Sequence, residues 1–206
     1  MNIAIIAANG RLGQELVKVA LEAGHTVRAG TRGISYFKNS DELTAIPCDA
    51  TNYHEVKALI KDQDIVFSCI GHVPGSLANV QTIATKNIVR VMKELGIKRF
   101  ITLTGTGARQ PGDHITLTDR FLNFGVELLD KPRIEDGRKH VEVLQKSDLD
   151  WTVIRVLKLQ FENNRPFTLR ENGPTLPFVS RSEAARAMLQ VAEKNTFIRQ
   201  LPIIGR

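Results

Sequence analysis

The sequence predicts an α/β fold built on a doubly wound, mainly parallel sheet with helices on both faces. Short apolar runs rich in β-branched residues alternate along the chain with longer segments of helical periodicity. A glycine-containing turn joins the first strand to the first helix, at the very start of the sequence. Strands separated by helices pair in parallel through right-handed crossovers, which is the arrangement of a Rossmann fold.

Composition and charge limit the class of protein. The 206 residues, 42% of them hydrophobic, suffice for one domain, which we expect to span residues 1–206. The net charge of +6 suits an anionic cofactor or substrate, but the basic residues are scattered, so we expect no nucleic-acid partner. No apolar run approaches the ~18–20 residues of a membrane span, and no signal peptide is recognised. We expect a cytoplasmic protein in which Cys48 and Cys69 are buried, reduced thiols.

Each element follows from local signals. Glycine ends two helical patterns, at Gly24 and Gly96, and Lys131-Pro132 ends a third. Asn52 and Ser180 each precede a glutamate by three residues, which predicts a capping box at a helix start. Strands are expected over residues 2–7, 25–31, 43–48, 64–71, 99–104, 151–156 and 197–204, with a short extended piece over 167–169. Helices are expected over residues 14–23, 53–61, 79–95, 117–129, 134–145 and 181–193.

The turn Ala8-Asn9-Gly10-Arg11-Leu12-Gly13 has the spacing of a dinucleotide-binding motif. Gly10 lets the backbone approach a pyrophosphate, and Gly13 lets the helix lie close to the sheet. Alanine, at position 7 or 8, stands where the motif has its first glycine, a change of small cost if φ stays negative there. We therefore predict that these six residues bind the cofactor phosphates at a helix N-terminus.

The ends of later strands predict the rest of the cofactor site. The second strand ends in Thr31-Arg32, with no carboxylate until Asp41, and an arginine can pair with a 2′-phosphate. NADP(H) is therefore favoured over NAD(H) as the cofactor. Asp49-Ala50 follows the third strand and is expected near the adenine. Cys69-Ile70-Gly71 closes the fourth strand, where the nicotinamide ribose is expected to pass.

Three side chains near the expected nicotinamide are candidates for catalysis. His72 follows the fourth strand and is a candidate acid or base. Thr104 and Thr106 lie at the end of the fifth strand, where a hydroxyl can hold a substrate carbonyl, and Thr104 is also expected to contact the cofactor. Gly71 and Lys158 complete the set expected around the substrate. No metal site is predicted.

These features resemble the atypical short-chain dehydrogenase/reductases of the NAD(P)H-binding, NmrA-like family, nearly end to end. The similarity is carried by Ala7-x-x-Gly10-x-x-Gly13, Arg32, Asp49, Thr85-Lys86-Asn87, Gly96-Ile97-Lys98-Arg99-Phe100-Ile101 and Glu142-x-Leu144-x-x-Ser147-x-Leu149-x-Trp151-Thr152-x-x-Arg155. Leu169-x-x-x-Gly173-Pro174 and Val179-Ser180-Arg181-Ser182-Glu183 are similar to biliverdin-IXβ/flavin reductases. The resemblance implies a sheet of order 3-2-1-4-5-6, bound NADPH and a small C-terminal substrate lobe, here residues 156–180.

The chain departs from that family in its catalytic residues. Members that oxidise alcohols carry Tyr-x-x-x-Lys, but Glu135 stands at the tyrosine position and Lys139 at the lysine position, where it is expected to hold the ribose. The chain can still support hydride transfer to an acceptor that needs little general-acid catalysis. The resemblance therefore implies an NADPH-dependent reductase of a flavin, a quinone or a similar acceptor. The alternative is a non-catalytic NAD(P)(H) sensor that binds a partner protein. The chain is expected to be a monomer or a homodimer.

Overall fold

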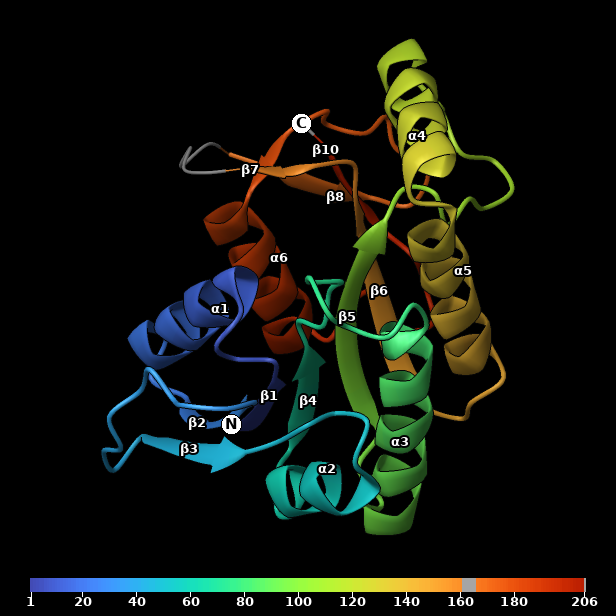
Figure 1. The fold of residues 1–206 in the computed structure, drawn as a ribbon. Helices are drawn as coiled ribbons and strands as arrows, with labels where there is room; N and C mark the ends of the chain where they lie inside the picture. The colour runs from blue at the N-terminus through green and yellow to red at the C-terminus, as the bar shows by residue number, and fades with distance from the viewer. Residues whose placement is uncertain (161–165, 206) are drawn as a thin grey trace.

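A sheet of eight strands forms the centre of the molecule (Figure 1). The computed structural model describes residues 1–160 and 166–205, without the side chains at positions 126 and 129. The strands of the sheet are β1 (Asn2–Ile6), β2 (Thr26–Thr31), β3 (Leu43–Pro47), β4 (Ile65–Ser68), β5 (Arg99–Gly105), β6 (Asp150–Val156), β8 (Thr168–Arg170) and β10 (Ile203–Gly205). Their order is β3-β2-β1-β4-β5-β6-β10-β8, which confirms the predicted order 3-2-1-4-5-6 and adds two short strands at one edge. Every pair in the sheet is parallel except β8 with β10.

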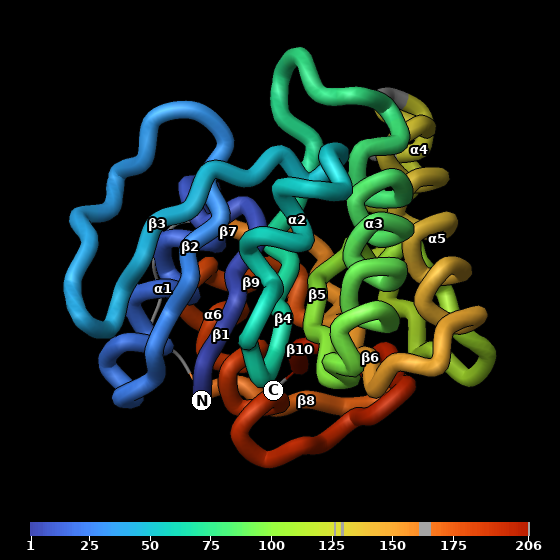
Figure 2. Tube along the Cα trace, turned by 90° about the horizontal axis from the view of Figure 1, so that it is seen from below, coloured from blue at the N-terminus to red at the C-terminus, as the bar shows by residue number. Residues whose placement is uncertain are grey.

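Helices cover both faces of the sheet, as predicted. They are α1 (Arg11–Glu22), α2 (Tyr53–Ile60), α3 (Val80–Leu95), α4 (Leu117–Leu129), α5 (Lys131–Gln145) and α6 (Arg181–Glu193). α1 and α6 pack together on one face, and α2, α3 and α5 pack on the other. Figure 2 shows these layers from below, with α1 and α6 on the left and α3 and α5 on the right. α4 extends beyond the sheet, at the upper end of α5 in Figure 1.

The core follows from the alternation of side chains along β1. Ile3 and Ile5 face the layer of α1 and α6, while Ala4 and Ile6 face the layer of α2, α3 and α5, and all four are fully buried. A central parallel strand is covered on both faces and therefore consists of an unbroken apolar run. Burial of each isoleucine stabilises the fold by ~1.5–3 kcal/mol. The end of β1, where the glycine turn starts, is thus fixed by the core.

Several element boundaries differ from those predicted, and two of the differences have a clear physical reason. α5 begins at Lys131 and not at residue 134, because Pro132 lies in its first turn, where a missing N–H loses no helical hydrogen bond. The strand predicted over 197–204 is limited to β10. Phe197 and Arg199 have φ values of +54° and +56°, and this left-handed backbone cannot belong to an extended strand.

The lobe predicted over residues 156–180 is described in part, since residues 161–165 lie outside the described residues. Within it, β7 (Leu159–Gln160) and β9 (Val179–Ser180) form a parallel pair separate from the main sheet. Across residues 1–160 and 166–205, no helix combines the length and the apolar character that crossing a membrane requires.

Candidate functional site

The C-terminal ends of four parallel strands meet at one edge of the sheet. In the strand register Ile6 is paired with Gly30 on one side and with Ser68 on the other, and Ser68 is paired with Thr102. The loops that follow β1, β2, β4 and β5 therefore start side by side. Ligands of open α/β sheets bind outside this edge.

The turn after β1 leads into a helix N-terminus that can receive an anion. Gly10 is the N-cap of α1, and no described side chain caps the helix there. The N–H groups of such a terminus attract phosphate. Gly13 has no room for a side chain, because a Cβ there would lie 2.4 Å from the carbonyl oxygen of Ala7. The helix packs directly on the turn, which is the role that its spacing predicts for Gly13.

Ala7 occupies the place of the motif's first glycine. Its φ is +60°, so the condition under which alanine would be tolerated without cost is not met. A left-handed backbone costs a residue with a Cβ about 1–2 kcal/mol. The Ala7 carbonyl accepts a hydrogen bond from Gly10 N at 3.0 Å, and Ala8 N donates to the Gly30 carbonyl at 2.9 Å. These two bonds hold the strained turn against β2.

Asn9 ties the loop after β2 to this turn. Its side-chain amide donates to the Ile34 carbonyl at 2.7 Å, and its Oδ1 accepts from Tyr36 N at 3.3 Å. The Asn9 carbonyl in turn accepts from Gln14 Nε2 at 2.8 Å. The side chain of Asn9 therefore holds the loop that carries Arg32, while its backbone forms part of the turn.

Arg32 is exposed at the end of β2, directly after the buried Thr31. Thr51 donates to Asp49 Oδ1 through its backbone N–H at 2.9 Å and its hydroxyl at 2.7 Å. These hydrogen bonds, together with the positive charge of Arg32, lower the pKa of the Asp49 carboxyl. The carboxylate is thus satisfied by Thr51, and Arg32 remains an exposed cation of the kind that binds a 2′-phosphate.

Two side chains of α3 position the loops after β3 and β4. Asn87 Nδ2 donates to the Ala50 carbonyl at 3.1 Å, and Gln81 Nε2 donates to the Ile70 carbonyl at 2.9 Å. The sequence offers Asn87 as a mark of family resemblance. It does not predict Gln81, because nothing in the pattern of a helix shows which loop its polar side chains reach.

The loop after β4 starts at Cys69, since β4 ends at Ser68. Burial raises the pKa of Cys69 to about 12, so its sulfur is a neutral thiol and not a nucleophilic thiolate. Burial and the nearby charges of Glu55 and Asp49 raise the pKa of Cys48 to about 12 as well. Both cysteines are free, as predicted, but only Cys48 is buried, whereas Cys69 is half-buried. A Cβ at Gly71 would meet nothing within 4 Å, so the chain is open to a ligand at that point.

A buried carboxylate holds His72 at the end of this loop. Asp136 on α5 is 2% exposed, and its Oδ2 lies 3.0 Å from His72 Nε2. The same carboxylate accepts from the backbone N–H groups of Gln81 at 2.8 Å and Thr82 at 2.9 Å, and so caps α3. The carbonyl of Ala78 lies 3.1 Å from His72 Nε2. Both partners are acceptors, which assigns the hydrogen of a neutral imidazole to Nε2.

The sequence profile of NAD(P)H-binding proteins matches residues 7–195. The chain belongs to this NAD(P)H-binding family. Among curated proteins, cinnamoyl-CoA reductase 1 of Petunia hybrida is 27% identical over 118 residues, which are 52% of this chain and 35% of that protein. The match thus spans about a third of the relative's length.

Solved structures share the fold over the whole chain. The oxidoreductase ylbE of Lactococcus lactis has a TM-score of 0.83 at 18% identity and covers 100% of this chain and 91% of its own. A short-chain dehydrogenase/reductase of Veillonella parvula, in complex with NADP, has a TM-score of 0.83 at 18% identity. The match covers 100% of this chain and 94% of that protein. Similarity at this level of identity shows that the chain shares the fold of these proteins.

Thr104 lies beneath α5 in this NAD(P)H-binding protein. It is 4% exposed, and a Cβ at Gly137 would lie 3.0 Å from its Oγ1, so α5 approaches the end of β5 closely. Lys139 and Glu135 each lie two residues from Gly137, about 200° around the helix. They therefore point away from β5, and Lys139 is exposed. Lys139 does not share the side of α5 that packs on Thr104, and its contact with a cofactor ribose stays a prediction.

Thr106 belongs to a buried network centred on Asp119, which the sequence did not predict. Thr106 Oγ1 donates to Asp119 Oδ1 at 3.1 Å and accepts from Asn123 Nδ2 at 2.9 Å. Arg109 pairs with both oxygens of the same carboxylate, at 2.8 and 3.0 Å. The hydroxyl of Thr106 thus anchors α4 to the end of β5 and is not presented to a substrate carbonyl. Lys158 follows the end of β6 by two residues, and its ammonium lies 5.8 Å from the centre of the Phe178 ring.

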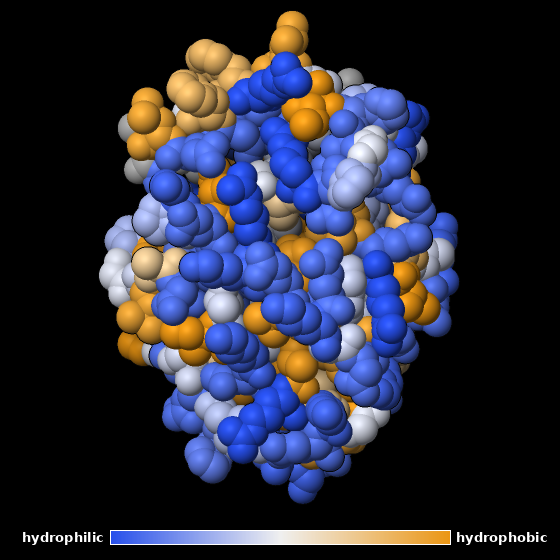
Figure 3. Space-filling view, turned by 90° about the vertical axis from the view of Figure 1, so that its right-hand side faces the viewer, coloured by the Kyte–Doolittle hydropathy of each residue, from blue (hydrophilic) through white to orange (hydrophobic). Residues whose placement is uncertain are grey.

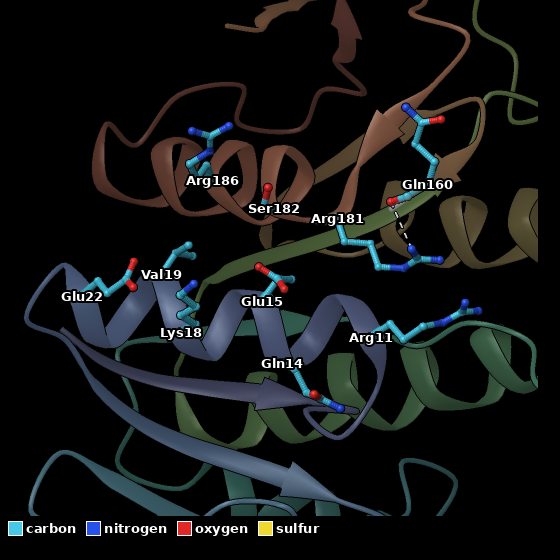
Figure 4. Close-up of a pocket in the computed structure, with 10 residues that line it drawn as sticks. All are labelled: Arg11, Gln14, Glu15, Lys18, Val19, Glu22, Gln160, Arg181, Ser182 and Arg186. Atoms are coloured by element: carbon cyan, nitrogen blue, oxygen red, sulfur yellow. Dashed lines mark hydrogen bonds between the residues drawn. The ribbon is translucent and has the colours of Figure 1, made fainter. Parts of the chain in front are cut away.

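A charged hollow of about 630 Å³ lies between α1 and α6 (Figure 4). It is lined by Arg11, Gln14, Glu15, Lys18, Val19, Glu22, Gln160, Arg181, Ser182 and Arg186. In Figure 4 Arg181 reaches Gln160, whose carbonyl accepts from Arg181 Nη1 at 3.1 Å. Cations and carboxylates share the lining, and Arg11 alone among them belongs to the glycine turn. The hollow therefore adjoins the candidate cofactor site without being part of it.

Proposed function

We propose that this protein is an NADPH-dependent reductase of a flavin, a quinone or a similar delocalised acceptor. The proposal rests on one combination, the helix N-terminus at Gly10 beside an exposed Arg32 at the end of β2. The first suits a pyrophosphate and the second a 2′-phosphate. The resemblance of residues 169–183 to biliverdin-IXβ/flavin reductases supports the class of acceptor.

Bound NADPH supplies a hydride, and the residues of this chain orient the acceptor and handle one proton. Glu135 and Lys139 stand at the positions of the Tyr-x-x-x-Lys pair, so the chain carries no tyrosine there to act as an acid. A delocalised acceptor takes up the hydride first and gains its proton from water or from His72. Asp136 fixes the His72 ring through Nε2, so His72 can pass on a proton only at Nδ1, which takes that proton from water before it donates it to the reduced acceptor.

The cofactor is tested by titrating the protein with NADPH and NADH. We expect tighter binding of NADPH, and we expect Arg32→Ala to weaken NADPH roughly 10- to 100-fold while NADH is unaffected. Lys38→Ala removes an exposed cation from the same loop and is the matched control. Equal affinity of the wild type for both cofactors would contradict the role of Arg32.

The reaction is tested by following NADPH absorbance with FMN and small quinones. Gly10→Asp places a negative charge in the phosphate turn and should abolish turnover, whereas Gly10→Ala tests for crowding alone, since its Cβ would lie 3.1 Å from the Ala7 carbonyl oxygen. His72→Gln should reduce the rate by less than the ~100-fold of an essential general acid. NADPH binding without turnover of any acceptor would overturn the reductase and favour the NAD(P)(H) sensor.

A further inference from the structure

Helix α4 carries a continuous exposed apolar stripe. Leu117 is 83% exposed, Phe121 76%, Phe124 66% and Leu128 75%. Figure 3 shows hydrophobic side chains gathered at the top of the molecule, the end where α4 stands in Figure 1. Large apolar side chains exposed together on one surface indicate an interaction site.

The opposite side of α4 is anchored to the molecule. Asp119 is 1% exposed, and both it and Asn123 bond to Thr106 at the end of β5. The buried network fixes the rotation of α4 about its own axis. The stripe is therefore held facing outwards and cannot turn into the core without breaking the ion pair of Asp119 with Arg109.

The spacing of the stripe suits another helix. Its four residues follow one another in steps of four, three and four, the a and d positions of a heptad pattern. A helix that lies on an anionic membrane needs an excess of lysine and arginine on its polar face. Next to the stripe, α4 carries one cation, Arg120, and one anion, Glu127.

We propose that two copies of this chain associate through α4, which pairs with itself antiparallel about a two-fold axis. In an antiparallel pair, the a positions of one helix lie opposite the d positions of the other. Phe121 therefore meets Phe124 of the second copy, and Leu117 meets Leu128. The flanking g positions then face each other and bring Arg120 towards Glu127 of the second copy, twice. Within its own chain Glu127 has only a long, exposed contact of 3.9 Å with Arg138 among the described residues.

The area of the stripe is sufficient for such an interface. An aromatic side chain buries ~150–250 Å² at most. With about three-quarters of each side chain exposed, the two phenylalanines and two leucines offer on the order of 450–750 Å² per copy. Two copies approach the ~1,200 Å² at the lower end of specific interfaces. The surface is self-complementary in shape and charge, which is what an interface with a two-fold axis requires.

Sedimentation velocity of the full chain tests the interface. We expect the wild type to dimerise at micromolar concentration and Phe121→Asp to raise the dissociation constant more than ~10-fold, as for a central aromatic contact. Ile34→Asp changes an apolar residue that is 87% exposed elsewhere and should leave the dimer intact. Circular dichroism and NADPH titration show that each variant is folded. A monomeric wild type, or a Phe121→Asp variant that still dimerises, would overturn the proposal.

A charge exchange tests the antiparallel register. Arg120→Glu and Glu127→Arg each place like charges together and should weaken self-association. An equimolar mixture of the two variants should restore it, because each interface then joins opposite charges. Failure of the mixture to associate would overturn the register. Binding of a monomeric wild type to phosphatidylserine vesicles, lost in Phe121→Asp, would replace the dimer by a membrane-binding surface.

Discussion

The two halves of the sheet hold their loops by different means. In the half from β1 to β4, the turn over residues 7–13 is shaped by backbone hydrogen bonds and by close packing at Gly13. In the half from β5 to β10, buried ionised side chains hold the loops in place. Arg155, 1% exposed, donates to both oxygens of Asp113 at 2.5 and 2.8 Å and to the carbonyls of Ala108, Glu171 and Leu201.

The first half of the sheet offers groups that can bind a ligand, whereas the second half uses its charged groups to support its own loops. Backbone N–H groups at the start of α1 can receive the negative charge of a ligand. Two buried carboxylates of the second half already have partners within the chain: Asp119 pairs with Arg109, and Asp136 is hydrogen-bonded to His72 and to the start of α3. A buried charge without a partner is costly, so these pairs fix the loops at this end of the sheet.

The largest expected effect is at Arg155. Arg155→Met leaves Asp113 as an unpaired buried carboxylate and should lower the free energy of unfolding by about 3–5 kcal/mol. Urea denaturation followed by circular dichroism measures it. Lys98→Met removes a cation from an exposed pair with Asp148 and should cost less than ~1 kcal/mol. Similar losses for the two variants would remove the contrast between buried and exposed pairs.

The next effect is pH dependence at His140. Burial lowers the pKa of His140 to about 4 from 6.5, against the opposing charge of Asp136, and neither ring nitrogen has a hydrogen-bond partner in the described chain. Between these pH values the unfolded chain binds a proton that the folded chain does not. The contribution of the neutral His140 to stability is therefore fully present above pH 6.5. As the pH is lowered from there, the free energy of unfolding falls, by about 3 kcal/mol at pH 4.

Urea denaturation across this pH range measures the effect of His140. His140→Leu should flatten the decline, whereas His54→Leu, at an exposed position, should leave it unchanged. A decline that persists in His140→Leu would place its origin in another group.

The smallest effect sharpens the first half of the comparison. Ala7→Gly relieves the positive φ of the phosphate turn and should raise the free energy of unfolding by up to about 1 kcal/mol, after the entropy of the more flexible unfolded chain is subtracted. Ala8→Gly changes the next residue, which has no such strain, and should instead destabilise by ~0.5–1 kcal/mol. Thermal unfolding distinguishes the two signs. Destabilisation by Ala7→Gly would show that the turn is not strained.

Part of the site could be predicted because its signals are local. The first 32 residues contain the first strand, the turn with Gly10 and Gly13, the first helix and Arg32. The spacing of these features is enough to predict which backbone groups lie together. The alternation of strands and helices predicts a parallel sheet with right-handed crossovers, whereas the order of the six central strands is implied by the resemblance to a known family. The exposed stripe of α4 is also present in the spacing of its residues, but a buried helix has the same periodicity.

The sequence by itself determined the fold class, the glycine turn and the cation after β2, because each depends on residues close together in the chain. Only the tertiary structure decided which partners the later polar residues contact. Asp136 meets His72 across 64 positions, and the close approach of α5 at Gly137 turns Lys139 outwards. Thr106 is drawn to Asp119. Packing contacts between residues far apart in the chain set how each helix is rotated about its own axis on the sheet. A rotation equivalent to one residue would point a different side chain at the site.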